Sequence, residues 1–199
     1  LAERFGGYCF FEPGRDRFDA LQKRALPGDG VVVAARRPLL KRRGFIQEFP
    51  FNEETPQLFD WMAKNKLNYL LVWMKYYDDL PEDLKAMAQA RGIVIESGHH
   101  NFSYWIPASK YAKTHPEFFA EIDGKRIKPS EGKGDLLLSE QLCTTNPELR
   151  SEIVRNMLDY CEKHPEVKVI SLVPNDGFGW CECKECSKFY DKSEKGDFY

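Results

Sequence analysis

Three of the six cysteines in this sequence, Cys181, Cys183 and Cys186, fall within a stretch of six residues. A C-x-C pattern overlapping a C-x-x-C pattern lets three thiolates converge on one ion, and a structural zinc takes four such ligands. Cys143 is the expected fourth ligand, because it precedes a predicted helix at the same end of the fold. A disulfide or free thiols are the alternatives. Four thiolates leave zinc no open position, so no catalytic cofactor is expected.

The two remaining cysteines are expected in hydrophobic surroundings. Cys161 continues a four-residue spacing that begins with Leu149, Ile153 and Met157, which places it on the apolar stripe of a helix and predicts a core position. Cys9 lies in a short apolar segment and is also expected to be buried.

A second group of residues that could do chemistry follows four predicted strands. Aromatic faces stack on pyranose rings, while carboxylates and amides hydrogen-bond sugar hydroxyls, and a pair of carboxyls can catalyse glycoside hydrolysis. The alternative is that these loops are simply polar and that their aromatics fill gaps beneath them. The residues are Glu48, Trp73, His99, His100, Asn175, Asp176 and Trp180.

The histidine pair His99 and His100 has a separate set of interpretations. Histidines at a strand end can hydrogen-bond a substrate hydroxyl or ligate a metal. The alternative is one buried structural histidine and one solvated histidine. The sequence leaves both open.

The elements that must position these residues alternate between strands and helices, which predicts an α/β fold with a parallel sheet. In such sheets, functional groups gather at the carboxyl ends of the strands. Thr55 and Asn146 are the expected N-caps of the first and third helices, each before a proline. Asp123-Gly124 predicts a hairpin turn. Strands are expected over 44–49, 67–74, 93–95 and 167–173, and helices over 55–66, 81–91 and 146–164.

Composition narrows the class of function. The chain has 199 residues, 42% of them hydrophobic, and a formal net charge of −2, which favours a folded domain over disorder. This charge balance gives no expectation of nucleic-acid binding. No apolar run approaches the roughly 20 residues of a membrane span. The N-terminus leaves the compartment open, with periplasmic and secreted locations both compatible.

Several motifs resemble those of family 20 glycoside hydrolases. Arg43-Gly44-Phe45, followed by Glu48, is similar to the first-strand motif of that family. Asp60-Trp61-Met62-Ala63 and Lys66-Leu67-Asn68 are similar to its first helix and second strand. Arg91-Gly92-Ile93 and Gly98-His99 resemble its third strand and the Gly-His pair after it. The opening residues 5–14 resemble the end of the small domain before such barrels, which also occurs in family 67 α-glucuronidases.

The second half of the chain resembles the domain-of-unknown-function family 4838, a group of uncharacterised bacterial proteins related to these hydrolases. The similarity lies in residues 142–148, in Asn175-Asp176-Gly177 and in the cysteine motif 181–186. It implies that residues 41–199 are the N-terminal half of a (β/α)8 TIM barrel, with the remainder contributed by further chain. Residues 1–40 would then be the end of a preceding small α/β domain and a linker.

The resemblance implies a glycoside hydrolase acting on a poly- or oligosaccharide. Asp176 stands where the family 20 enzymes carry a glutamate and is the expected general acid, whereas Asn175 replaces the aspartate of their Asp-Glu pair. Arg43 joins the strand-end residues as an expected substrate contact. The alternatives are a non-catalytic carbohydrate-binding protein on a degenerate hydrolase scaffold and a metal-stabilised interaction module.

Overall fold

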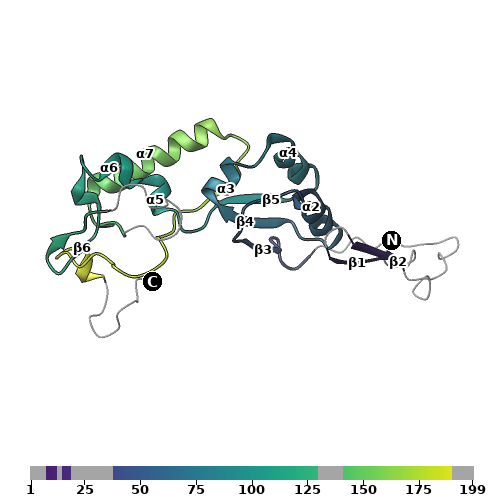
Figure 1. Cartoon of the computed structure of the whole chain (residues 1–199), viewed down its shortest axis with the longest axis horizontal. Coiled ribbons are helices and arrows are strands. Elements are labelled where there is room, and N and C mark those ends of the chain that lie inside the picture. Colours follow the sequence, from purple (N-terminus) through teal and green to yellow (C-terminus); the bar gives the residue numbers. More distant parts are fainter. Residues whose placement is uncertain (1–7, 13–14, 19–37, 130–140, 190–199) are drawn as a thin grey trace. The chain divides into compact units, whose positions relative to one another are not determined.

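A computed structural model describes residues 8–12, 15–18, 38–129 and 141–189 (Figure 1). Strands β1 (Tyr8–Glu12) and β2 (Arg15–Phe18) form an antiparallel pair. The side chain of Cys9, which the sequence predicts to be buried, lies outside the described part. Among the described residues, no helix combines the length and apolar character needed to cross a bilayer.

Four strands form one parallel sheet, which confirms the predicted α/β class. Their order is β3 (Gly44–Gln47), β4 (Tyr69–Trp73), β5 (Val94–Gly98) and β8 (Val169–Ile170). The chain divides into two compact units. The first unit comprises Leu1–Leu71 and Asp79–Ile95, and the second comprises Val72–Asp78 and Glu96–Tyr199.

The first unit contains two of the predicted helices, α2 (Thr55–Lys64) and α4 (Glu82–Ala90), which contact each other (Figure 1). Phe59 and Met62 of α2 are fully buried. The expected cap at Thr55 is wrong by one residue, because Glu54 occupies the N-cap position. The Thr55 hydroxyl instead accepts a hydrogen bond from the backbone N–H of Asn52, at 3.0 Å, and so closes the turn before the helix.

The second unit is built around the long helix α7 (Pro147–Lys163), which contacts α5 (Phe102–Trp105). Its core is rich in aromatic side chains, among them Trp105, Phe118 and Tyr160. The other elements are α3 (Met74–Asp78), α6 (Ala108–Tyr111), η2 (Pro116–Phe118), β6 (Glu121–Ile122), β7 (Lys125–Arg126) and η3 (Cys186–Lys188).

The predicted hairpin is confirmed as the antiparallel pair β6–β7. Asp123 and Gly124 at its turn have φ angles of 50° and 70°. Positive φ at both central residues is the signature of a type I′ turn, in which the backbone twist matches that of the flanking strands. The Asp-Gly pair therefore specified this turn locally.

Strand β8 is shorter than the predicted span 167–173, and Asn101 supplies the reason. The Asn101 amide donates to the carbonyl oxygen of Ser171 at 2.6 Å, and its Oδ1 accepts from the N–H of Val173 at 2.9 Å. Beyond Ile170, these side-chain bonds join two backbone bonds, from the Ser171 N–H to the Ser97 carbonyl oxygen at 3.3 Å and from the Asn101 N–H to the Val173 carbonyl oxygen at 3.0 Å, so the regular ladder gives way to a mixed set of bonds.

The core position expected for Cys161 is wrong, because this thiol is exposed. A four-residue step on a helix of 3.6 residues per turn drifts by about 40°. Starting from Leu149, the buried stripe therefore passes through Ile153 to Tyr160 rather than to Cys161.

Asn146 is the N-cap of α7 as predicted, and this cap gives a stability test. Oδ1 of Asn146 accepts the N–H groups of Glu148 at 2.9 Å and Leu149 at 3.1 Å. We expect Asn146→Ala to lower the free energy of unfolding by about 1 kcal/mol in urea denaturation, because both N–H groups lose their acceptor. Asn146→Ser should retain most of the stability, since serine also caps. Equal losses in the two variants would contradict this role.

Candidate metal centre

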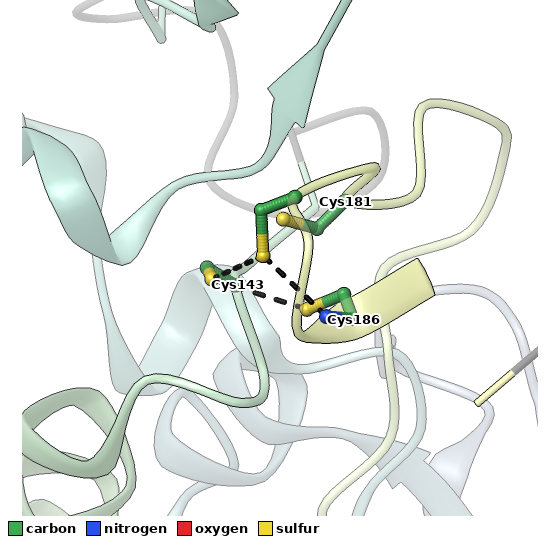
Figure 2. Close-up of side chains that lie close together, drawn as sticks. Cys143, Cys181 and Cys186 are labelled. Atoms are coloured by element: carbon green, nitrogen blue, oxygen red, sulfur yellow. Dashed lines mark hydrogen bonds between the residues drawn. The ribbon is translucent and has the colours of Figure 1, made fainter. Parts of the chain in front are cut away.

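The second unit brings Cys143, Cys181, Cys183 and Cys186 together into what we call the cysteine cluster. Figure 2 labels three of them, Cys143, Cys181 and Cys186. All four are buried, and their Sγ atoms lie within 4.8 Å of one another. The Sγ of Cys143 is 3.7 Å from that of Cys183 and 3.9 Å from that of Cys186. The five cysteines whose side chains the structure describes form no disulfide bonds.

These separations can be compared with the geometry of a metal–thiolate centre. Four sulfurs placed tetrahedrally at about 2.3 Å from a zinc ion lie about 3.8 Å apart. The Cys143–Cys183 and Cys143–Cys186 separations both match this value. The donor set also fits, since four buried thiols offer soft ligands and no carboxylate or water position. The cluster can therefore hold a metal ion without large rearrangement.

Polar groups around the cluster are arranged to stabilise negative charge on sulfur. The hydroxyl of Thr145 lies 3.1 Å from the Sγ of Cys186, and the N–H of Glu121 donates to the Sγ of Cys181 at 3.4 Å. The guanidinium of Arg126 donates to the same Cys181 sulfur at 3.8 Å. Such groups next to the ligands orient them and offset the excess charge of four thiolates.

The same contacts shift the acidity of the cluster. The neighbouring thiol of Cys181, followed by Arg126 and Thr145, lowers the pKa of Cys143 to about 4, although burial opposes the shift. The thiolate is the form that binds metal. The same contact raises the pKa of Cys181, so the negative charge of this pair resides on the Cys143 sulfur.

Three separate segments position the four thiols. Cys143 precedes the α7 cap, and its N–H donates to the carbonyl oxygen of Phe118 at 2.8 Å. Cys181 and Cys183 flank Glu182, whose N–H donates to the carbonyl oxygen of Glu121 in β6. The cluster thus joins the start of α7, the β6–β7 hairpin and the chain after β8.

The predicted strand-end residues after β4 and β5 form a second, aromatic group. The rings of Trp73 and His99 stack with centroids 4.2 Å apart, and His100 meets His99 edge-on at 4.6 Å. The Nδ1 of His100 lies 2.7 Å from the carbonyl oxygen of Pro174 and donates to it in the Nδ1–H tautomer. Trp73 is buried, whereas the two histidines that pack against it are partly exposed.

Residues 175–180, which we call the strand-end loop, connect the aromatic group to the cysteine cluster. Asn175 is buried, and its Oδ1 accepts from the N–H of Ser103 at 3.1 Å. Its carbonyl oxygen accepts from the Gln141 amide at 2.5 Å. Asp176 is exposed and Trp180 partly exposed. The Asn175 side chain is thus committed to the scaffold, whereas that of Asp176 faces solvent.

The remaining two residues that the sequence predicts to contact substrate, Arg43 and Glu48, belong to the first unit. The guanidinium of Arg43 donates to the backbone carbonyl oxygens of Lys66 at 2.8 Å and Leu40 at 2.6 Å. Glu48 is exposed after β3. These bonds give Arg43 a structural task that its motif alone did not reveal.

Sequence reasoning missed a polar network around Asp78. The Asp78 carboxylate accepts the hydroxyls of Tyr104 at 2.6 Å and Tyr160 at 3.1 Å, and the Tyr160 hydroxyl lies 3.3 Å from that of Ser97. Burial, and then the bond to Asp78, raises the pKa of Tyr104. Asp78 is the last residue of α3, and only its place in the polar segment that follows β4 could have suggested this role.

The fold and the cluster define an α/β protein with a buried four-cysteine site. Residues 33–198 match the family described as Domain of unknown function (DUF4838), and the chain belongs to this family. No curated protein shows a significant match to the chain.

Proposed function

We propose that this chain is part of a glycoside hydrolase that acts on a poly- or oligosaccharide. The observation that carries the proposal is that two partly exposed histidines, His99 and His100, lie next to the strand-end loop. The His100 ring contacts the carbonyl oxygen of Pro174, the residue directly before this loop. Both lie after parallel strands, where α/β folds place their sites. The motifs similar to family 20 and family 67 enzymes add support.

We propose that the sheet is the first half of a (β/α)8 barrel. Strands β3 and β8 are the outer members of the strand order. Ile46 of β3 is 53% exposed and Leu172 beyond β8 is 46% exposed. In a closed barrel, further strands cover such edges.

In the proposed reaction, Asp176 is the general acid. Its protonated carboxyl would donate to the glycosidic oxygen as the bond to the anomeric carbon breaks. His99, His100 and Trp180 would hold the sugar beside it. The second carboxylate that such chemistry requires is assigned to the rest of the barrel.

We assign zinc to the cysteine cluster as a structural ion. Its ligands would be Cys143, Cys181, Cys183 and Cys186, with no open position for water. Its contribution is to fix the C-terminal end of the strand-end loop, where Trp180 joins Cys181. Asn175 fixes the other end.

Asp176→Asn tests the catalytic role. In the full-length protein, we expect about a 100-fold loss of kcat on unactivated oligosaccharides, because an amide cannot donate the proton. The loss should be smaller on nitrophenyl glycosides and uronides, whose leaving groups need less protonation. Asp159→Asn, on exposed α7 surface, is the matched control. Unchanged turnover of both substrate types would remove Asp176 as the acid.

A second candidate function is non-catalytic carbohydrate binding. The exposure of Asp176 favours it, because general acids in glycosidases sit in apolar surroundings that raise their pKa. Oligosaccharide binding without turnover by the full-length protein would support this candidate. Turnover that Asp176→Asn abolishes would exclude it.

A further inference from the structure

We propose that Phe178, at the tip of the strand-end loop, is a carbohydrate-stacking residue that contributes directly to ligand affinity. The inference rests on the proposed function and extends it, since it assigns a contact to a side chain that neither the cysteine cluster nor the proposed acid requires. The ligand it fits is the apolar face of a pyranose ring.

The first observation is the exposure of Phe178. Its side chain is 98% exposed, whereas Trp73 and Trp105 of the same unit are 3% and 2% exposed. Leaving a phenylalanine in water forgoes about 1.5–3 kcal/mol of burial. The described part of the fold leaves this ring uncovered, so a ligand that packs on it would recover part of that free energy.

The second observation is the backbone that presents the ring. Gly177 and Gly179, on either side of Phe178, have φ angles of 113° and 87°, which side chains other than glycine rarely adopt. A Cβ on Gly179 would also lie 3.3 Å from the Cδ1 of Ile122 in β6. These two glycines let the chain turn twice and direct the intervening residue outward.

The third observation is that both ends of this turn are anchored. Asn175 is buried and bonded to Ser103 and Gln141, and Cys181 belongs to the buried cluster. An anchored loop loses less conformational entropy when a ligand binds. Phe178 is therefore an exposed ring on a short loop with two fixed ends.

The neighbours of Phe178 identify the ligand class. Asp176 supplies an exposed carboxylate two residues before the ring, and Trp180 a partly exposed indole two residues after it. A carboxylate accepts hydrogen bonds from hydroxyls, while aromatic faces cover the C–H face of a sugar. Residues 175–180 contain no basic side chain, which disfavours a phosphate-bearing ligand.

The test uses isothermal titration of the full-length protein with cellohexaose, xylohexaose, chitohexaose and an oligogalacturonate. We expect Phe178→Ala to weaken binding of the preferred oligosaccharide about tenfold. Phe178→Trp should restore the affinity, whereas Phe178→Leu should not, because it lacks a flat face. Phe189→Ala is the matched control, since Phe189 is 72% exposed but lies beyond the cluster.

Two outcomes would overturn the stacking role of Phe178, and they differ in whether they also overturn the proposed function. Wild-type affinity in Phe178→Ala, with oligosaccharide binding intact, would remove the stacking role and leave the proposed function standing. No binding of any of the four oligosaccharides by the wild type would overturn both. If Phe178→Ala abolishes self-association in light scattering without changing sugar affinity, the ring serves a protein contact instead.

Discussion

Cys183→Ser should remove the metal from the cysteine cluster and lower the free energy of unfolding by about 4 kcal/mol or more. An ion present at a thousand times its dissociation constant stabilises the folded state by about that amount. A serine hydroxyl is a poor substitute for thiolate, and Cys183 lies 3.7 Å from Cys143 within the cluster. The loss should be visible as a lower midpoint in guanidinium denaturation.

The exposed Cys161 provides the matched control for this prediction. Cys161→Ser should retain one metal equivalent and the wild-type midpoint. A chelator should destabilise the wild type and Cys161→Ser to the level of Cys183→Ser, while leaving Cys183→Ser unchanged. Equal stability of the three proteins, with and without chelator, would contradict a structural metal.

Gly44→Ala should destabilise the first unit by about 3 kcal/mol or more. A Cβ on Gly44 would overlap the carbonyl group of Tyr69 and lie 3.1 Å from its Cα. Overpacking costs about 1–3 kcal/mol where side chains can adjust, and more where, as here, the obstacle is backbone. The N–H groups of Asn68 and Tyr69, which both donate to the Arg43 carbonyl oxygen, should lose protection from hydrogen exchange.

Gly92→Ala is the control for Gly44→Ala, because both remove a glycine from the same unit. A Cβ on Gly92 would meet none of the described atoms within 4 Å, and its φ of 69° adds only about 1 kcal/mol of strain. Hydrogen exchange at Asn68 and Tyr69 should be unaffected. A smaller loss of stability in Gly44→Ala than in Gly92→Ala would contradict the close approach of β3 to β4.

The features that the sequence predicted well depend on local chemistry. Asp123-Gly124 suits a type I′ turn whatever surrounds it, and Asn146 followed by proline forms a helix cap from its own side chain. The alternation of strands and helices likewise predicted the parallel sheet. The spacing of four residues was a less reliable guide to the burial of Cys161, because the angular drift of each step accumulates over a helix of 17 residues.

The features that the sequence did not predict depend on contacts between distant residues. Asn101 shortens β8 through bonds to residues 70 or more positions away. The Arg43 side chain reaches back to Leu40 and forward to Lys66, which no periodicity indicates. Asp78 gains its importance from Tyr104 and Tyr160, on two later helices.

The cysteine cluster depends partly on local sequence and partly on contacts between distant residues. The spacing of Cys181, Cys183 and Cys186 suggests three converging thiols from local sequence alone. The place of Cys143 beside them depended on the topology of the sheet. Cys143 precedes α7, which leads into β8, whereas the other three cysteines follow β8, and these two segments lie at the same end of a parallel sheet. The structure brings the four sulfurs within 4.8 Å of one another.

The central claim is that this cluster is a four-thiolate zinc centre, and X-ray absorption at the zinc edge tests it most directly. The protein should be purified without chelator from zinc-supplemented medium, with total zinc counted by mass spectrometry. We expect one zinc per chain with four sulfur ligands at about 2.3 Å. Absence of bound zinc, or a first shell containing nitrogen or oxygen, would contradict the claim.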